Sequence, residues 1–192
     1  MYPDECAGPP WHGRRCWREA NASVRHIFQK HRGRLDLLTR TAGHIRAGLE
    51  ELDLLYRDLC PETCTFCPEP CCISADIWFD LKDLLFLHAA GLPVPAQSPK
   101  EQNHMPCSFL GPGGCLLART SRPWICTWYL CPTQKLRLIK ENPGRLYRIE
   151  ELTGKIRGLR GKMEENFIKL AVSGVFKDSK QELIPTVFPV HC

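Results

Sequence analysis

Cysteine spacing is the feature that most constrains how this chain can fold. Nine of the twelve cysteines in the 192-residue sequence lie between residues 60 and 131, on segments rich in proline and glycine. They form a first group of Cys60, Cys64, Cys67, Cys71 and Cys72 and a second group of Cys107, Cys115, Cys126 and Cys131. Thiolates at this density on turns suit a soft metal ion or an iron–sulfur cluster, and they also suit a disulfide framework.

The compartment decides between these two uses of cysteine. The N-terminus, Met-Tyr-Pro-Asp-Glu-Cys, has neither the basic residues nor the apolar stretch of a secretory signal. No apolar run approaches the roughly 18 residues expected of a membrane span. We therefore expect a cytoplasmic protein without a membrane span, in which thiols stay reduced. Because a bond between adjacent residues is strained, the vicinal pair Cys71-Cys72 also argues against a disulfide scaffold.

The charge pattern argues against a nucleic-acid partner. The net charge of +5 is modest, and basic residues are most frequent in stretches with a helical pattern. A nucleic-acid interface would show a basic stripe with interleaved aromatic residues on a recognisable module, and we find none in the sequence. These charges are therefore expected to cover solvated helix faces.

Apolar periodicity predicts a mostly α fold. Apolar residues recur every three or four positions over residues 17–59, with a break near Gly33, and over residues 145–175. A further helix is predicted over residues 75–90 with Ser74 as its N-cap. Prolines exclude regular structure over residues 60–72, and the Gly-rich stretch 109–117 predicts a short β-hairpin. A short helix carrying Cys126 and another helix after Cys131 complete the expected elements.

Two long amphipathic helices thus flank the cysteine-rich loops. The simplest way to bury both apolar stripes is to pack them against each other and the 75–90 helix, which gives a small helical bundle. The expected organisation is an irregular segment 1–15, one helical domain 16–180 with a cysteine region 60–132, and a C-terminal tail 181–192. Any stripe left exposed would bind a protein partner or form a homodimer.

The candidate metal ligands are the nine cysteines of the two groups. One turn can supply two ligands from Cys64-x2-Cys67. Cys71 and Cys72 are expected to point in different directions and to serve different metals, or one metal and one structural role. No histidine has ligand spacing inside the groups, so an all-sulfur site is favoured.

Arg122 is the candidate cofactor-binding residue that is not a ligand. Its guanidinium can donate to cluster sulfurs and offset the thiolate charge, or it can pin the hairpin to the following helix. Cys6, Cys16 and Cys192 stand alone near the chain ends and are expected to be bystanders, unless a terminal segment folds back to add a ligand.

A two-part motif covers the cysteine region. It consists of Cys64, Cys67, Cys71 and Cys72, then Pro106, Cys107, Phe109, Leu110 and Cys115, and then Arg122, Pro123, Cys126 and Cys131. This motif resembles that of the YkgJ-type cysteine-cluster family, described as zinc- or iron-chelating domains and related to flagellin lysine N-methylases. The chain departs from that family at Ala118, Thr127 and Leu130, where Tyr, Arg and Pro are common. The resemblance implies a metal or cluster site held by eight cysteines.

Eight thiolates suffice for two zinc ions, for a four-iron cluster with a structural zinc, or for two clusters. Aromatic residues near the motifs favour an iron–sulfur cluster over zinc, because a shell that excludes water stabilises clusters. These aromatics are Phe66, Trp78, Phe109, Trp124, Trp128 and Tyr129. We therefore expect a metal- or cluster-binding protein that acts in redox chemistry, metal handling or partner binding.

Two alternatives stay open at this point. The family resemblance suggests a cluster-dependent transferase such as a protein-lysine N-methyltransferase. The spacing Cys60-x3-Cys64-x2-Cys67 also matches that of radical S-adenosylmethionine enzymes, but the chain lacks their alternating strands and helices. The other alternative is a structural zinc module, so whether the protein is an enzyme stays undecided.

Overall fold

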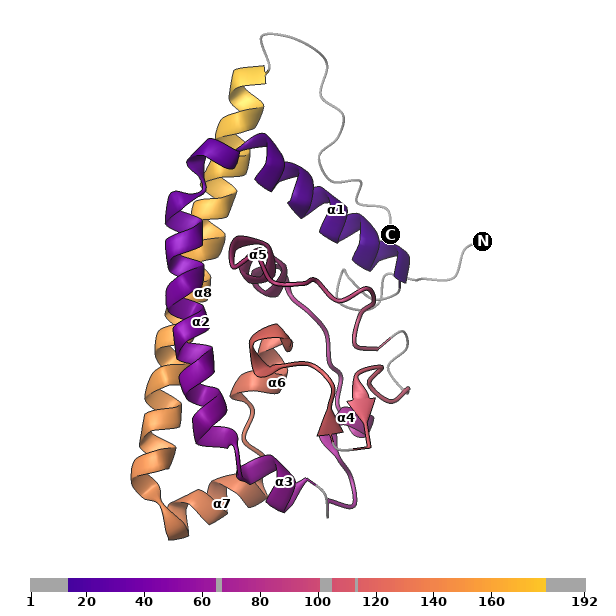
Figure 1. Cartoon of the computed structure of the whole chain (residues 1–192), viewed down its shortest axis with the longest axis vertical. Helices are drawn as coiled ribbons and strands as arrows, with labels where there is room; N and C mark the ends of the chain where they lie inside the picture. The colour runs from indigo at the N-terminus through magenta and orange to yellow at the C-terminus, as the bar shows by residue number, and fades with distance from the viewer. Residues whose placement is uncertain (1–13, 65–66, 101–104, 113, 179–192) are drawn as a thin grey trace.

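Two long antiparallel helices, here called the spine, dominate the molecule. In a computed structural model, which describes residues 14–64, 67–100, 105–112 and 114–178, helix α2 (Asp36–Tyr56) lies beside helix α8 (Pro143–Asp178) (Figure 1). Their apolar stripes pack against each other, as the periodicity predicts. The buried stripe residues are Leu38, Ala42, Ile45, Leu49, Leu52 and Tyr56 on α2, and Leu146, Ile149, Leu152, Ile156, Met163, Phe167 and Leu170 on α8.

Small and polar residues set the distance and register of the spine. A Cβ atom at Gly48 would lie 3.0 Å from the side chain of Ile156, so glycine lets the helices approach closely there. Arg148 donates to Glu51 at 2.7 Å across the same interface. These contacts fix how α2 and α8 are aligned, whereas the stability of the spine comes mainly from apolar burial.

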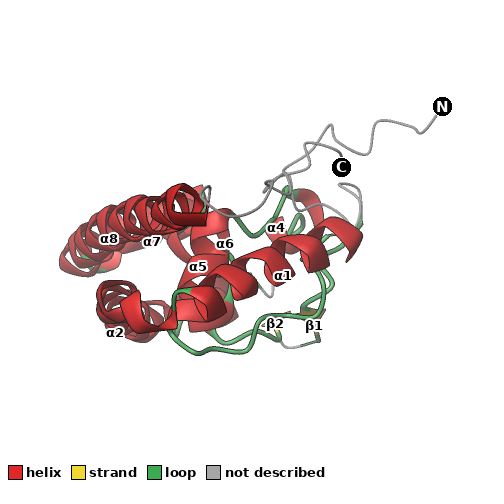
Figure 2. Cartoon of the chain, turned by 90° about the horizontal axis from the view of Figure 1, so that it is seen from above, coloured by secondary structure: helices red, strands yellow, loops and turns green. Residues whose placement is uncertain are grey.

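The N-terminal helical stretch breaks where Gly33 predicts it. Helix α1 (Arg14–Lys30) is followed by the 3-10 turn η1 (Arg32–Arg34), after which α2 leaves in a new direction (Figure 1). α1 packs against α5 (Leu81–Ala89) (Figure 2). The Trp17 ring stacks on Phe79 with centroids 4.9 Å apart, and its indole N–H donates to the Pro95 carbonyl at 2.8 Å.

The predicted helix over residues 75–90 is shorter than expected, because α5 begins at Leu81. Asp80 and Asp83 form a capping box, in which each side chain accepts the other's backbone N–H, at 2.8 and 2.9 Å. Ser74 instead ends the short helix α4 (Cys71–Ser74). Between the two helices Ile77 and Phe79 are buried and alternate with less buried neighbours, which is the period-two pattern of extended backbone.

The prediction that residues 60–72 lack regular structure is wrong at both ends of the segment. Helix α3 (Leu59–Thr63) contains Cys60, and α4 contains the vicinal cysteines. Pro61 lies in the first turn of α3, where its missing N–H leaves no helical hydrogen bond unmade. Residues 65–66 lie outside the described part of the chain.

The remaining elements follow the sequence predictions closely. Strands β1 (Leu110–Gly111) and β2 (Gly114–Cys115) form the short antiparallel hairpin, and Gly114 takes a φ of +109° that favours glycine. The 3-10 turn η2 (Arg119–Ser121), α6 (Trp124–Trp128) and α7 (Pro132–Glu141) lead back to α8. The fold is therefore mostly α with one small hairpin. No helix in the described residues is long and apolar enough to cross a membrane.

Candidate metal centre

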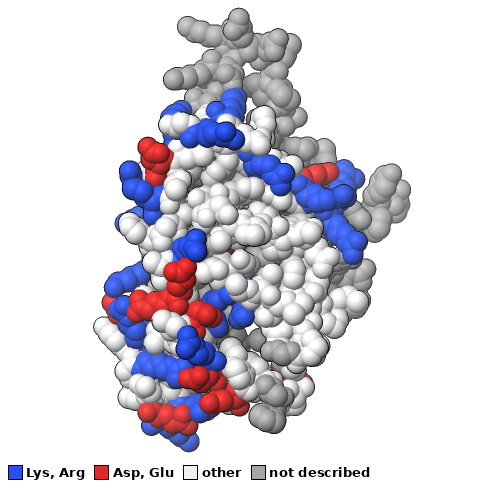
Figure 3. All heavy atoms as spheres, in the orientation of Figure 1, with Lys and Arg blue, Asp and Glu red and all other residues white. Residues whose placement is uncertain are grey.

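The cysteine region (residues 60–132) folds beside the spine. In Figure 1, α4 and the hairpin lie away from α8 and α2, α6 lies between them and the spine, and α3 follows the lower end of α2. Figure 3 shows few Lys, Arg, Asp or Glu side chains on this face over the hairpin and α4, whereas charges of both signs cover the lower part of the spine. The Cys107 N–H donates to the Cys72 carbonyl at 2.8 Å, which joins the second cysteine group directly to the first.

Thiols from the two groups interact with one another electrostatically. Cys72 of the first group interacts with both Cys107 and Cys126 of the second. Cys126 also interacts with Cys115 and with Cys71. None of the nine cysteines, all of which the structure describes, is in a disulfide. The fold therefore brings sulfurs from sequence positions far apart into one neighbourhood as thiols.

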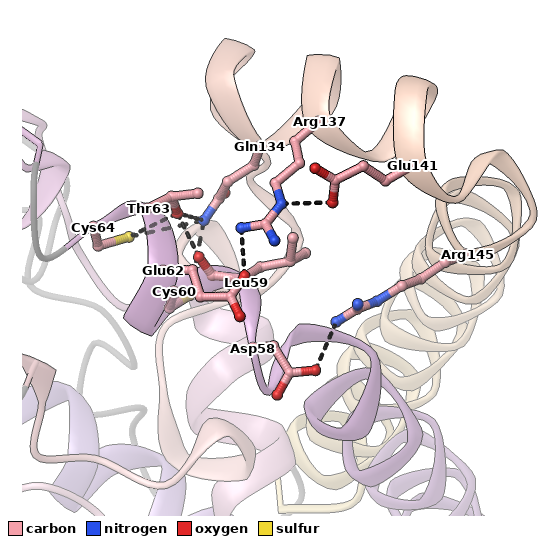
Figure 4. A network of polar contacts seen from close by, with 10 residues as sticks. All are labelled: Asp58, Leu59, Cys60, Glu62, Thr63, Cys64, Gln134, Arg137, Glu141 and Arg145. Carbon is pink, nitrogen blue, oxygen red and sulfur yellow. Dashed lines mark hydrogen bonds and ion pairs between the residues drawn. The ribbon is translucent and has the colours of Figure 1, made fainter.

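A second pair of thiols lies at α3, with Cys60 inside the helix and Cys64 as its C-cap residue. The Cys64 N–H donates to the Cys60 carbonyl at 2.8 Å, so the two side chains follow one helical turn apart. Gln134 of α7 reaches this turn (Figure 4), and its Nε2 lies 3.9 Å from Cys60 Sγ and 3.8 Å from Cys64 Sγ. The same amide donates to Thr63 Oγ1 at 3.0 Å.

Neighbouring thiols share protons in pairs. The hydrogen bond from Cys64 lowers the pKa of Cys60 to about 6, and the same bond raises the pKa of Cys64 above its ordinary value. In the vicinal pair, the bond from Cys72 lowers the pKa of Cys71 to about 6 and raises that of Cys72. Each pair holds one thiolate near neutral pH, the form that binds a metal.

Burial acts against thiolates elsewhere in the centre. Desolvation raises the pKa of Cys126 to about 12 and also raises the pKa of Cys107. A metal that bound these sulfurs would therefore have to displace protons, and its binding would depend on pH.

Two arginine side chains offset the thiolate charge at Cys60. Arg119 hydrogen-bonds Cys60 and, like Arg122, lowers its pKa electrostatically. Arg122 also acts on Cys126, while its Nε donates to the Leu117 carbonyl at 2.9 Å. Both roles expected of Arg122, charge compensation and bracing of the hairpin, are therefore compatible with its position.

Arg119 and Lys100 are functional candidates that sequence reasoning missed. The Arg119 guanidinium is buried, lies 4.3 Å from the centroid of the Tyr56 ring and donates to Asp53 at 3.0 Å. Lys100 is 1% exposed, and its ammonium donates to the Ile73 carbonyl at 3.0 Å while it lowers the pKa of Cys107. No spacing rule marks either residue, because only the fold brings them to the sulfurs.

A buried ion-pair network holds α6, which carries Cys126, against the bundle. Arg160 of α8 donates to Asp83 at 2.8 Å and to Asp80 at 2.7 Å. Asp83 also accepts the Trp124 N–H at 3.1 Å, and the Arg160 guanidinium lies 5.1 Å from the Trp124 ring centroid. Burial raises the pKa of Asp83, and the Arg160 charge opposes that shift.

Not every predicted ligand joins the sulfur network in the same way. The Cys131 Sγ caps α7 by accepting the Gln134 N–H at 3.5 Å. Cys67 is exposed, and its N–H donates to the Cys64 carbonyl at 3.2 Å. Cys16 lies on α1, outside the cysteine region. Cys6, Cys192 and Phe66 lie outside the described residues.

The donor set has the chemistry that a soft metal or an iron–sulfur cluster requires. Thiols are the soft ligands that zinc and iron–sulfur clusters accept, and the nearby cations favour their charged form. Among the residues that the structure describes, no three Cys, His, Asp or Glu side chains converge as a finished metal cage. The thiols are neighbours that a metal would have to draw together.

Comparison of the chain with protein-family models, with curated proteins and with solved structures found no match in any of the three.

Proposed function

We propose that this protein binds a thiolate-ligated metal centre, an iron–sulfur cluster in preference to zinc, through cysteines of both groups. The observation that carries the proposal is the 2.8 Å hydrogen bond from the Cys107 N–H to the Cys72 carbonyl, which brings the two cysteine groups together while their cysteines stay free thiols. In a disulfide framework these cysteines would be bonded in pairs. Unrelated structural thiols would not need to lie in one neighbourhood. The resemblance to YkgJ-type cysteine-cluster proteins adds support from the motif.

The residues around the sulfurs have separate roles in this proposal. Arg119 and Arg122 offset thiolate charge at Cys60, and Lys100 does so at Cys107. Partly buried aromatic residues, among them Trp124 and Phe109, limit the access of water to the sulfurs from the side of α6. A bound cluster would supply one-electron transfer, and the protein would tune its potential through these charges and hydrogen bonds.

Anaerobic purification tests the proposal. We expect brown protein with broad absorbance near ~400 nm, containing iron and acid-labile sulfide in comparable amounts. The variant Cys107→Ser/Cys126→Ser should lose most of this absorbance, whereas the control Cys16→Ser should retain it. Colourless protein with stoichiometric zinc would favour the structural zinc module over the iron–sulfur cluster. Protein that binds neither metal would refute the proposal.

The transferase alternative has its own test on the same sample. If the cluster has no catalytic iron, adding S-adenosylmethionine to the brown protein should leave its spectrum unchanged. A spectral change on addition would favour the transferase.

We also propose that a protein partner or a second copy of the chain binds to exposed apolar side chains of the spine. The stripes of α2 and α8 pack within one chain. Large apolar side chains of the spine that stay exposed are Leu37, Leu54, Tyr147, Ile168 and Val172.

A further inference from the structure

Helix α1 and the adjoining end of the spine form a basic surface. Residues 14–40 contain eight Lys or Arg side chains, all exposed, and only two acids, Glu19 and Asp36. Figure 3 shows Lys and Arg side chains along α1 and around the upper end of the spine with few acids between them, whereas both signs are mixed on the lower spine. A surface on which one sign predominates attracts partners of the opposite charge.

A groove lies at this basic end, between the start of α2 and the C-terminal half of α8. It has a volume of about 380 Å³, and the residues that line it, here called the basic groove, are Arg34, Leu37, Leu38, Asn166, Lys169 and Leu170. Leu38 and Leu170 are buried, whereas Leu37 is 49% exposed. Arg34 and Lys169 are exposed and bring positive charge from both sides, and none of the described residues that line the groove is acidic.

We propose that the basic groove binds an acidic, amphipathic segment of a partner protein, whose apolar side chains cover Leu37 and whose carboxylates meet Arg34 and Lys169. This inference rests on the protein partner proposed above, and adds to it the site and the chemistry of that partner.

The geometry of the spine favours a helical segment as the occupant. α2 and α8 lie side by side, and a third helix can pack against such a pair as helices do in a bundle. Apolar anchors at helical spacing are what a groove of this kind recognises in a partner. Two more large apolar side chains stay exposed in the same part of α8, Ile168 and Val172, and extend the apolar area next to the groove.

A second copy of the chain is a poorer occupant, because the two basic ends would repel each other. The lower spine does not offer the groove an uncompensated acidic surface either. Several of its acids pair within the chain at 2.6 to 2.9 Å: Glu50 with Arg46, Glu51 with Arg148, and Glu151 with Lys155.

Nucleic acids and membranes also match this surface less well. None of the residues that line the groove is aromatic, so a nucleic acid would find no ring on which to stack its bases there. The apolar face of α1, which includes Trp17, Val24 and Phe28, is buried in the core and is not free to enter a lipid surface.

The test is fluorescence anisotropy of a labelled synthetic peptide with the reduced full chain. The peptide is about 18 residues long, enough to form a helix, with Leu at every third or fourth position and mainly Glu between them. One control peptide carries Lys in place of Glu, and another has the same composition in scrambled order. We expect both controls to bind at least about 10-fold more weakly, and binding of the acidic peptide to weaken as salt is added.

Matched variants locate the binding site. Arg34→Glu/Lys169→Glu should weaken binding by about 10-fold, because two attractions become repulsions, and Arg34→Gln/Lys169→Gln should have a smaller effect. Arg57→Glu/Lys140→Glu makes the same change in net charge at exposed positions near the other end of the spine and should change binding little.

Leu37→Ser tests the apolar part of the groove and should also weaken binding. Leu54→Ser, at a position that is 59% exposed near the other end of α2, is its control and should not. All of these changes are at exposed positions, so the midpoints of denaturant unfolding should stay close to that of the unaltered protein.

Equal binding of the acidic and basic peptides, or equal effects of the groove variants and their controls, would overturn the inference. Weakening by Leu54→Ser instead of Leu37→Ser would overturn it too, but would leave a partner at the other end of the spine. Absorbance of the metal centre tests that centre separately, because none of these substitutions should change it.

Other occupants would also be recognised. A dimer in sedimentation equilibrium that Arg34→Glu/Lys169→Glu dissociates would assign the groove to a second copy of the chain. Tighter binding of a single-stranded oligonucleotide than of the acidic peptide would assign the basic surface to nucleic acid. Failure of the full chain to bind the peptide, as when residues 179–192 fill the groove, would equally overturn the inference.

Discussion

The spine and the cysteine region are stabilised in different ways. Spine residues such as Ile45, Leu52 and Ile156 are at most 1% exposed and repeat with helical period. Apart from α5, the cysteine region has helices of four or five residues and a hairpin with strands of two residues each, and it exposes Cys64, Cys67 and Cys71. Isolated helices this short are not stable on their own. Regular apolar packing can therefore hold the spine without a cofactor, whereas the cysteine region depends on polar contacts and, in our proposal, on a metal.

Metal removal should separate the two regions most strongly. Chelation under reducing conditions should greatly speed amide hydrogen exchange in residues 67–80 and 105–131, because binding energy at a structural thiolate site is also folding energy. Exchange in the α2 and α8 segments should change little. Hydrogen exchange with mass spectrometry of the purified and chelated protein checks this. Equal acceleration in both regions would show that the spine also depends on the metal.

The Arg160 network joins the two regions, so breaking it should cost more than a typical contact. Arg160→Ala leaves the Asp83 carboxylate buried without its partner, and we expect a loss of about 3–5 kcal/mol in the free energy of unfolding. Denaturant unfolding measures this loss. Lys162→Ala, two residues further along the same helix and exposed, is the control and should change stability by less than about 0.5 kcal/mol. Similar effects for both variants would contradict the role of the network.

A cavity in the spine should cost stability independently of the metal. Leu52 is 0% exposed, and Leu52→Ala should lower the free energy of unfolding by about 2–5 kcal/mol. The loss should be the same with and without bound metal, as compared by denaturant unfolding of both forms. Leu54→Ala, at a position that is 59% exposed, serves as the control with little expected effect. A loss seen only in the metal-bound form would link the spine to the centre.

The smallest expected effect is on the reactivity of one thiol. Because the pKa of Cys60 is lowered to about 6, metal-free protein should carry this residue as a thiolate at pH 7, and its alkylation should slow as the pH falls through about 6. Arg119→Gln removes a cation that lowers this pKa, so the Cys60 rate at pH 7 should fall a few-fold, whereas Arg157→Gln should leave it unchanged. Iodoacetamide labelling with peptide mass spectrometry measures both rates. A Cys60 that reacts only above pH 8 would contradict the thiolate assignment.

The two regions also differ in how far sequence reasoning reached. The 3.6-residue period of apolar residues predicted the two helices of the spine, and Gly33 marked the break before α2, because local pattern and tertiary packing agree there. In the cysteine region the buried residues Ile77 and Phe79 alternate with less buried neighbours, as in extended backbone. The capping box of Asp80 and Asp83 then starts the helix there and not at Ser74. A helix was therefore predicted six residues too early.

The candidate site shows the same division. The cysteines and Arg122 stand out from spacing alone. Arg119, Lys100 and Gln134 do not, because their positions near sulfur depend on how α3, α7 and the loops meet; Gln134 and Cys60, for example, are 74 residues apart in the sequence. What marks Arg119 and Lys100 is that their charges are buried, and what marks Gln134 is its capping box with Cys131. Neither feature can be read from residue spacing.

X-ray absorption spectroscopy at the iron or zinc edge of anaerobically purified protein tests the central claim most directly. The account predicts an inner shell made only of sulfur, at about 2.3 Å, that loses sulfur neighbours in Cys72→Ser and equally in Cys107→Ser, one variant from each group. An inner shell dominated by nitrogen or oxygen, or one that only a single cysteine group can alter, would contradict it.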